Sequence, residues 1–138
     1  MEPKPPNVLI AYDGSEPSRR ALDRVRSFMP NASVAVVNVA APVYRNPALS
    51  KFAADDEEER QQAALTEAKA LLAERGIEAR STAPVGDAAE EIVRVAGESG
   101  ADLVVLGARG LNPLERLVLG SVSTKVLHQA PCDVLVVR

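Results

Sequence analysis

The sequence predicts an α/β fold, a single three-layer, doubly wound domain built on a five-stranded parallel sheet. Short apolar segments alternate with amphipathic segments along the whole chain. Several apolar segments are continuous, as the buried strands of parallel sheets are. Such alternation is typical of a sheet that helices cover on both faces. The length of 138 residues fits one domain, which we assign to residues 1–138 with an N-terminal tail at 1–6.

The first strand and helix are predicted near the N-terminus. Residues 8–12 form a short apolar run. Ser15 then offers a helix N-cap, and Pro17 falls in the first helical turn, where a missing N–H costs little. Pro30 ends this helix. Apolar residues at helical spacing form a stripe that we expect to face the core, consisting of Ala21, Leu22, Val25, Phe28 and Met29.

The middle of the chain predicts a strand, a long loop and a second helix. Residues 33–39 are rich in valine and predict the strand, and residues 40–55 predict the loop. Residues 56–75 predict the helix, which Gly76 ends. We expect the acidic residues 55–59 to form its solvated start, where carboxylates favour the positive helix end. An interaction patch is the alternative for these acidic residues.

The C-terminal half predicts three more strands and two more helices. Residues 77–83 alternate in polarity and predict a third strand, whereas residues 103–106 and 134–137 predict a fourth and a fifth. Asp87 caps a third helix with capping-box spacing to Glu90. Residues predicted to face the core from this helix are Ala88, Ala89, Ile92, Val93 and Ala96. Residues 121–130 predict the last helix, with inward side chains at Val122, Val126 and Leu127.

The order of the strands is predicted to be 3-2-1-4-5. Crossovers between parallel strands are right-handed, which limits the possible topologies. This flavodoxin-like or Rossmann-like order makes strands 1 and 4 neighbours. Ligands bind such sheets at the carboxyl ends of the strands, where the winding direction reverses. We therefore expect a crevice formed by residues 11–15, the residues after Val39 and the residues after Leu106.

Composition excludes several classes of protein. Hydrophobic residues make up 46% and charged residues 25%, which excludes disordered, collagen-like and coiled-coil chains. Aromatic residues are only 3% and the net charge is −3, so we expect no nucleic-acid partner. A single cysteine fits a reducing compartment. No segment has the length of a membrane span or the pattern of a signal peptide, so we expect a cytoplasmic protein without a membrane partner.

Glycines after the fourth strand predict a phosphate-binding cradle. Gly107 ends the strand, Gly110 follows within a turn, and Gly120 and Ser121 open a helix. Backbone N–H groups approach an anion most closely where no Cβ intervenes, and the helix start adds positive potential. The segment is neither a Walker A sequence nor a G-x-G-x-x-G fingerprint. The alternative interpretation is that these glycines only turn the chain and cap a helix.

The chain resembles the universal stress proteins. The Gly-x2-Gly-x9-Gly-Ser spacing resembles the signature of their ATP-binding branch. The resemblance extends over nearly the whole chain and includes residues 11–15 (Ala-Tyr-Asp-Gly-Ser), 37–39 (Val-Asn-Val), 101–107 (Ala-Asp-Leu-Val-Val-Leu-Gly) and 130–137 (Ala-Pro-Cys-Asp-Val-Leu-Val-Val). It implies a fold like that of the adenine nucleotide alpha hydrolases.

The resemblance also implies roles for individual residues. Asp13 would face the ribose or phosphates and help to hold a metal ion, Mg2+ or Mn2+. Ala11 and Val39 would flank adenine, Val39 through its backbone, and Tyr12 belongs to the same opening motif. The set that would contact ribose and phosphates is Gly107, Ala108, Arg109, Gly110, Gly120, Ser121, Val122 and Ser123. Ala108 stands where many members have Ser or Thr, and Arg109 either reaches a phosphate or points to solvent.

Some of these residues also have structural interpretations. Asp13 suits an Asx-turn in which Gly14 supplies a positive φ. Lys125 is expected to be a solvated surface residue, and His128 a helix-end residue. Cys132 is expected to be a packed or interfacial thiol, because no cation is apparent nearby.

The sequence thus predicts a cytoplasmic, ATP-binding regulatory protein of the universal stress type. We expect no dedicated enzyme, because the chain lacks a P-loop lysine and a strong general base, and any ATP hydrolysis would be slow. One alternative is a nucleotide-independent interaction module, since the resemblance implies a homodimer through the last strand, residues 133–138. Another is a slow ATPase or an adenylate-forming enzyme.

Overall fold

One parallel sheet forms the centre of the molecule. A computed structural model describes residues 3–42, 47–108 and 119–138, with only the backbone described for residues 47–51. In these ranges five strands lie in the order β3-β2-β1-β4-β5, which confirms the predicted order. The strands are β1 (Asn7–Ala11), β2 (Ser33–Val37), β3 (Arg80–Thr82), β4 (Leu103–Gly107) and β5 (Asp133–Val137).

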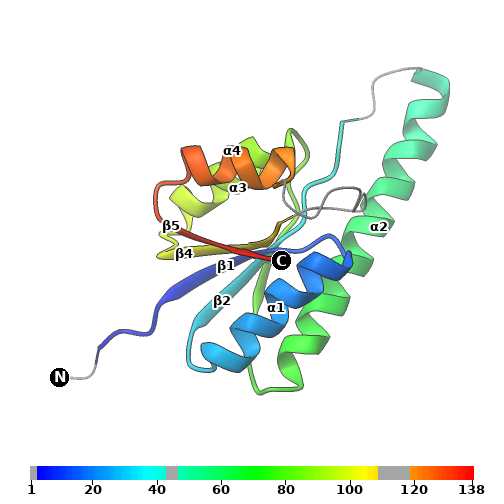
Figure 1. Cartoon of the computed structure of the whole chain (residues 1–138). Coiled ribbons are helices and arrows are strands. Elements are labelled where there is room, and N and C mark those ends of the chain that lie inside the picture. Colours follow the sequence, from blue (N-terminus) through cyan, green and yellow to red (C-terminus); the bar gives the residue numbers. More distant parts are fainter. Residues whose placement is uncertain (1–2, 43–46, 109–118) are drawn as a thin grey trace.

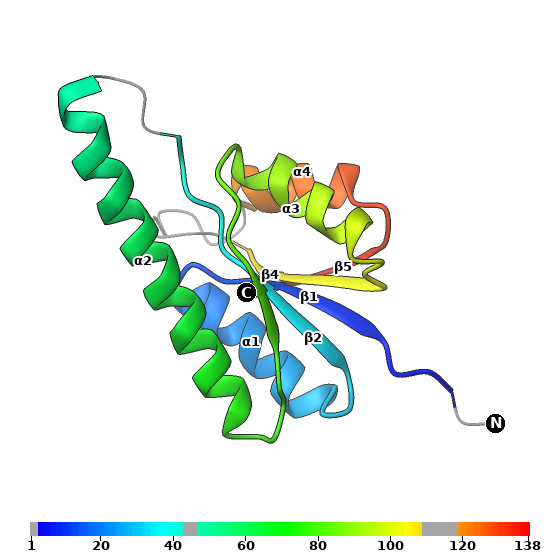
Figure 2. The same cartoon turned by 180° about the vertical axis from the view of Figure 1, so that it is seen from behind.

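Helices cover both faces of this sheet. Helices α1 (Glu16–Phe28) and α2 (Pro47–Ala73) lie on one face, and α3 (Ala88–Glu98) and α4 (Ser121–Gln129) lie on the other (Figures 1 and 2). The central strand β1 pairs with β2 and β4 in parallel, with Leu9 opposite Ala35 and Val104. The chain therefore has the three-layer α/β architecture that its alternating segments predict.

Two aliphatic cores separate the sheet from its helices. Successive strand residues point to opposite faces, so Val8 and Ile10 pack under α1 and α2, and Leu9 packs under α3 and α4. The side chains of Leu9 and Ile10 are at most 1% exposed. The complete burial of β1 fixes where its carboxyl end lies.

Local capping groups fix several helix ends as the sequence predicts. Ser15 accepts a hydrogen bond from the Ser18 amide at the start of α1, and Asp87 accepts one from the Glu90 amide at the start of α3. After α2, Gly76 has φ +73°, and the Ile77 amide donates back over it to the Leu72 carbonyl. This is a Schellman-type helix end, for which glycine is favoured.

The start of α2 differs from the prediction. The helix begins at Pro47, nine residues before the predicted start at residue 56, so the predicted loop at 40–55 is wrong beyond residue 46. Proline is well suited to the first helical turn, and the residues after it include no helix breaker. The acidic residues 55–59 consequently lie inside the helix, and the prediction that they form its start is also wrong.

Three predicted core residues are exposed instead. Phe28, the last residue of α1, is 70% exposed, and the Arg24 guanidinium lies 5.8 Å from its ring centroid. Val122 and Leu127 of α4 are 36% and 42% exposed. In α4 the buried residues are Ser123 and Val126, three apart, because hydrogen bonds of Ser123 set the rotation of the helix.

The edge strand β3 is shorter than the predicted strand at residues 77–83. Only Arg80–Thr82 pair, and they pair with β2. Ile77 and Ala79 are buried before the strand begins. In the parts of the chain that the structure describes, no helix combines the length and the apolar character needed to pass through a bilayer.

Candidate functional site

The ends of β1 and β2 meet at the carboxyl edge of the sheet. The Tyr12 amide donates to the Val37 carbonyl over 3.0 Å, and the Asn38 side-chain amide donates to the Tyr12 carbonyl over 2.8 Å. Ala11, which follows the buried part of β1, is half-buried against the core under α3 and α4. The structure thus brings together the first two of the three segments that the sequence assigns to the crevice.

Asp13 lies in a tight turn just after β1. Its Oδ1 accepts a hydrogen bond from the Ser15 amide over 2.9 Å, and Gly14 has φ +81°. This is the Asx-turn that the sequence offers as a structural interpretation. The side chain is nevertheless exposed, so its carboxylate also faces solvent. Asp13 can therefore both shape the turn and bind a ligand.

Tyr12 points away from this edge into the core. Its side chain is 2% exposed, and its hydroxyl donates to the Glu67 carboxylate on α2. Burial is the main reason that the pKa of Tyr12 rises to about 12, and the hydrogen bond to Glu67 raises it further. Because the side chain is enclosed, a ligand at the edge can meet Tyr12 only through its backbone.

Val39 offers its backbone toward β1. The amides on either side of it, at Asn38 and Ala40, donate to the carbonyls of Thr82 and Pro84 on the β3 side. Peptide groups alternate in direction along an extended chain, so those of Val39 point to the opposite side, beyond the end of β1. This geometry suits the predicted backbone contact of Val39 with a base.

Gly107 is required by packing at the end of β4. A Cβ placed on Gly107 would lie 2.6 Å from the Pro17 Cβ and 2.7 Å from the Pro17 carbonyl carbon. Distances below 3.0 Å are not tolerated between such atoms. The start of α1 therefore occupies the space beside Gly107. The next two residues of the predicted cradle, Arg109 and Gly110, lie outside the described residues.

The amino end of α4 is tied to the end of β4. The Ala108 carbonyl accepts hydrogen bonds from the Gly120 amide over 2.7 Å and from the Ser123 hydroxyl over 2.8 Å. Ala108 is buried, and its own amide donates to the Val137 carbonyl. Ser123 is 2% exposed, and its hydroxyl also contacts the Gly120 carbonyl. The hydroxyl proton is therefore used in hydrogen bonds within the protein.

Donor groups remain at the start of α4. The first intrahelical hydrogen bond runs from the Thr124 amide to the Gly120 carbonyl, so the amides of Ser121, Val122 and Ser123 precede it. Gly120 occupies the N-cap position without a side-chain hydrogen bond, whereas side chains cap α1 and α3. Ser121 and Val122 are exposed. This helix end can donate N–H groups to an anion.

Two charged residues of the described chain influence one another at this edge, Asp13 after β1 and Arg60 on α2. The pKa of the Arg60 guanidinium is raised, mainly by its hydrogen bonds with Glu57 and further by the charge of Asp13. Among the residues that the structure describes, no group of three or more His, Cys, Asp or Glu side chains could hold a metal ion. Asp13 is a single carboxylate, so a metal ion bound there would need further ligands, as magnesium sites that include phosphates and water have.

The remaining candidates have structural roles. Lys125 is not simply solvated, because its ammonium contacts Asp87 and Glu90, each over 3.3 Å. His128 is exposed at the end of α4. Cys132 packs against the α3–α4 core, and burial raises the pKa of its thiol, as expected of a packed thiol.

Sequence reasoning assigned no role to two buried polar residues at this edge. Asn38 and Gln61 are 7% and 3% exposed, and the Gln61 side-chain amide donates a hydrogen bond to the Asn38 carbonyl. Asn38 belongs to the segment predicted to reach the crevice and is a polar residue within the valine-rich run at 33–39. Gln61 has no comparable signal, because it lies among polar residues of a helix.

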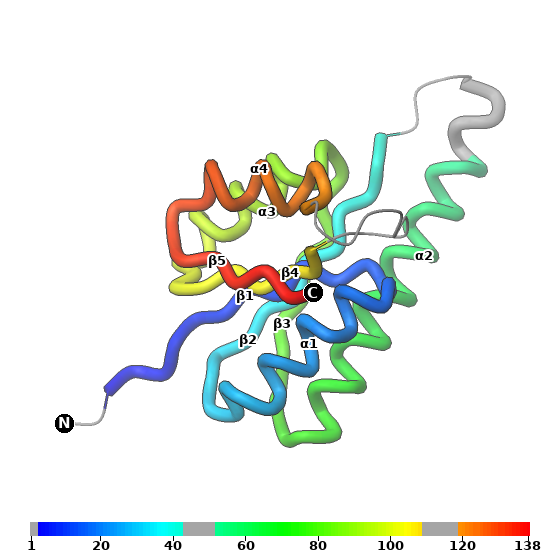
Figure 3. Tube along the Cα trace, in the orientation of Figure 1, coloured from blue at the N-terminus to red at the C-terminus, as the bar shows by residue number. Residues whose placement is uncertain are grey.

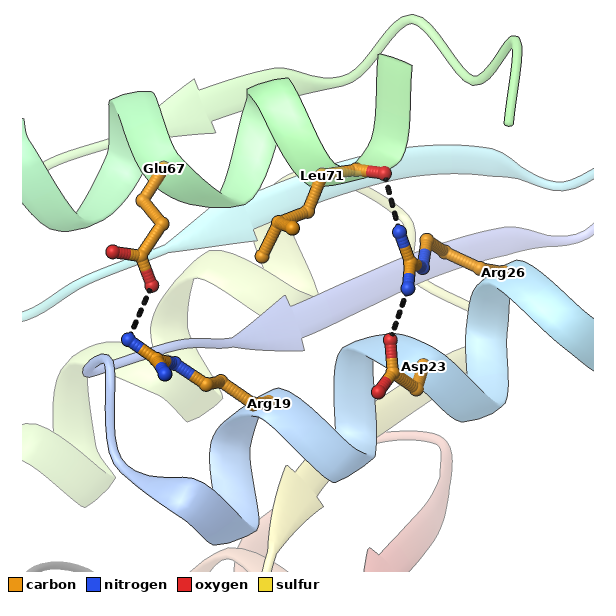
Figure 4. Close-up of a pocket in the computed structure, with 5 residues that line it drawn as sticks. All are labelled: Arg19, Asp23, Arg26, Glu67 and Leu71. Atoms are coloured by element: carbon orange, nitrogen blue, oxygen red, sulfur yellow. Dashed lines mark hydrogen bonds and ion pairs between the residues drawn. The ribbon is translucent and has the colours of Figure 1, made fainter. Parts of the chain in front are cut away.

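A groove between α1 and α2 lies apart from the predicted site. It has a volume of about 320 Å³ and is lined by Arg19, Asp23, Arg26, Glu67 and Leu71 (Figure 4). Its charged groups pair with one another, Arg19 with Glu67 over 3.1 Å and Arg26 with Asp23 over 2.5 Å. None of the residues predicted for nucleotide binding lines this groove.

Comparison with known proteins gives the family. The model of the universal stress protein family matches residues 6–138. The chain belongs to the universal stress protein family. A family member from Thermus aquaticus is 36% identical over 136 residues, which cover 95% of this chain and 97% of the relative.

Solved structures of universal stress proteins share the fold. The universal stress protein UspA from Lactobacillus plantarum superposes with a TM-score of 0.85 at 25% identity, covering 99% of this chain and 100% of the other. A universal stress protein solved in complex with cAMP superposes with a TM-score of 0.75 at 28% identity, covering 96% and 97%. The family resemblance inferred from the motifs is confirmed.

Proposed function

We propose that this universal stress protein binds an adenine nucleotide, ATP with Mg2+ or Mn2+, at the carboxyl edge of the sheet and acts as a nucleotide-dependent regulator. The observation that carries the proposal is the start of α4. The Ala108 carbonyl holds it at the end of β4, with donor amides that no side chain of the described residues caps. An anion is favoured there by these amides and by the helix dipole.

The nucleotide would lie across the three strand ends. Adenine would contact Ala11 and the backbone of Val39, and the phosphates would lie toward Gly120 and Ser121. The cradle would be completed by the segment that contains Arg109 and Gly110. Support for adenine comes from the family member solved with cAMP, which is 28% identical to this chain.

The metal ion would be held by few protein atoms. Asp13 is the carboxylate placed next to the turn, and phosphate oxygens and water would supply the other ligands. When bound, the ion would neutralise phosphate charge. We therefore expect ATP affinity to depend on the divalent cation more strongly than AMP affinity does.

We do not propose that the protein hydrolyses ATP rapidly. Phosphoryl transfer needs positioned charge around the terminal phosphate, and the sequence supplies no P-loop lysine. Asp13 is already engaged with the Ser15 amide. The nucleotide would instead shift a conformational or partner equilibrium, in the reducing cytoplasm that a single cysteine suits.

A second candidate function is dimerisation that needs no nucleotide. Within the described ranges, strand β5 pairs with β4 on one side only, and Val134, Leu135 and Val136 are half-buried. An apolar edge strand is a site for pairing with a second chain. Sedimentation with and without ATP separates the two functions. A dimer with the same dissociation constant in both conditions favours dimerisation that needs no nucleotide.

Calorimetric titration with ATP, ADP and AMP, each with and without Mg2+, tests the proposal. We expect binding of all three and the largest cation effect for ATP. Gly120→Val should weaken binding, because side-chain atoms would stand in front of the donor amides. Gly97→Val is the matched control in α3, where a Cβ meets only the Pro131 Cγ, at 3.9 Å. Absence of binding at millimolar nucleotide would end the proposal.

A further inference from the structure

A buried glutamine on α2 joins the ends of two strands. The Gln61 Nε2 donates to the Asn38 carbonyl over 2.6 Å and to the Pro84 carbonyl over 2.9 Å. Asn38 follows β2 and Pro84 follows β3, so both N–H groups of one amide hold these two ends together. Gln61 is 3% exposed, and α2 lies along β2 and β3 here (Figures 2 and 3).

Asn38 extends this connection to β1. Its Nδ2 donates to the Tyr12 carbonyl over 2.8 Å. Its Oδ1 is buried without a hydrogen-bond partner among the described residues. An unpaired buried oxygen disfavours the folded state, whereas the hydrogen bond from Nδ2 to the Tyr12 carbonyl favours it. Asn38 therefore links the end of β2 to the residue that follows β1.

The hydrogen bond from Gln61 fixes the direction of the Val39 amide. A trans peptide group is planar, so the C=O of one residue and the N–H of the next point in opposite directions. Gln61 holds the Asn38 carbonyl toward α2 and the end of β3. The Val39 N–H must then point away from α2, beyond the end of β1. In the same way, Asn38 holds the peptide between Tyr12 and Asp13.

We propose that Gln61 and Asn38 are positioning residues that give the nucleotide site its preference for adenine. This inference rests on the proposed function. A fixed N–H at Val39 matches adenine, whose Watson–Crick edge presents a ring nitrogen that accepts a hydrogen bond. Guanine presents a ring N–H at the same place, which meets the Val39 N–H donor to donor. Losing the orientation of this amide therefore reduces discrimination between the bases as well as affinity.

The test compares Gln61→Leu with Gln62→Leu. Gln62 is the exposed neighbour on the same helix, so the control makes the same chemical change outside the connection. Calorimetry gives the dissociation constants for ATP and GTP, and urea unfolding gives stability. Gln61→Leu is expected to weaken ATP binding about tenfold, the effect of losing one oriented hydrogen bond, and to lower the ratio of ATP to GTP affinity. Gln62→Leu should keep both values within about twofold.

Two results would overturn the inference while leaving the proposed function intact. One is a folded Gln61→Leu protein that binds ATP as tightly as the wild type. The other is an equal loss for ATP and GTP, which reports a purely structural role. Wild-type protein that binds no ATP would remove the proposed function and the inference with it.

A measurement on the wild type covers the case in which Gln61→Leu does not fold. Amide NMR follows the Val39 N–H as ATP is added. A shift of its resonance and slower hydrogen exchange are expected, and the Gly97 amide in α3 serves as the reference. ATP binding that leaves the Val39 amide unchanged in both respects would overturn the inference.

Discussion

Gly107 shows how one missing side chain serves the packing of a whole helix. The start of α1 lies directly against it, so the first turn of α1 and the end of β4 meet at backbone distance. The contact also positions Ser15 and its neighbours beside the carboxyl edge. Packing against Pro17 thus favours glycine at this position, and stability measurements test that packing role.

Gly107→Ala is expected to destabilise the protein by about 1–3 kcal/mol, the usual cost of overpacking. The new Cβ would lie 2.6 Å from the Pro17 Cβ, which belongs to a rigid ring, and 2.7 Å from the Pro17 carbonyl carbon, which belongs to the backbone. Gly97→Ala is the opposite control, because its Cβ has room and alanine favours helices by about 1 kcal/mol. Urea unfolding measures both, and equal stability of Gly107→Ala and wild type would contradict the packing argument.

The buried hydroxyl of Tyr12 makes stability depend on pH in the alkaline range. Its pKa rises to about 12 in the folded state from an ordinary value of 10.0, chiefly through burial. Because the pKa of Tyr12 is higher in the folded than in the unfolded protein, its contribution to the free energy of unfolding is complete below pH 10. This contribution is lost as the pH rises toward 12. Tyr12→Phe should remove this alkaline loss. Tyrosinate absorbance checks the pKa in a Tyr44→Phe background, which leaves Tyr12 as the one tyrosine of the sequence.

At the scale of single elements, the start of α3 is tied to α4 by charge. The Asp87 Oδ2 accepts from the Glu90 amide over 3.0 Å and from the Lys125 ammonium over 3.3 Å. These contacts, the amide first, hold the pKa of Asp87 below its ordinary value of 3.8. Asp87 therefore acts as a helix cap and as the partner of a neighbouring helix.

Replacing Asp87 separates these two roles. Because the folded pKa is lowered, its contribution is complete above pH 3.8 and is lost as the pH falls through the folded value. Asp87→Asn keeps an oxygen for the cap and should flatten the acid dependence of the free energy of unfolding. Asp87→Ala should lower stability at neutral pH as well. Urea unfolding between pH 2.5 and 7 checks both, and an unchanged acid slope in Asp87→Asn would contradict the assignment.

Elements whose signals are local could be predicted from the sequence. Ser15, Asp87 and Gly76 cap their helices as expected, because each acts on backbone groups a few residues away. The rotation of α4 could not be predicted, because Ser123 bonds to Ala108, fifteen residues earlier. The polar segment after Pro47 lacks apolar residues at helical spacing, so it has no periodic pattern from which its helix could be predicted.

At the scale of the whole molecule, the layered architecture followed from the alternating pattern. The strand order was a preference for the flavodoxin-like arrangement, which one sequence does not determine, and the structure confirms it. The contacts that align the edge could not be predicted from the pattern. Gln61 reaches Asn38 and Pro84 across twenty-three residues in each direction, and only the fold shows that they touch. Tyr12 belonged to the predicted site, yet its side chain is turned into the core by burial.

Nucleotide binding should stabilise the entire domain. A ligand that binds only the folded state adds about 2.7 kcal/mol at a hundredfold excess over its dissociation constant. We therefore expect the thermal midpoint to rise with ATP concentration in proportion to the calorimetric affinity. Gly120→Val should show a smaller rise at the same ATP concentration. A thermal midpoint that does not change with ATP concentration, although calorimetry detects binding, would mean that the unfolded chain binds ATP as tightly as the folded protein does.

Helix α2 has two unlike parts. From Gln61 onward its buried residues recur at Leu65, Ala68 and Leu72, whereas no described side chain in residues 52–60 is buried. The amino-terminal part of α2 extends beyond the sheet (Figure 1). Short helical segments without tertiary contacts are marginal in water. The outer turns of α2 should therefore unwind and re-form many times for each global unfolding event. A protease would then cut the outer turns of α2 first and leave the sheet and the helices packed on its two faces folded.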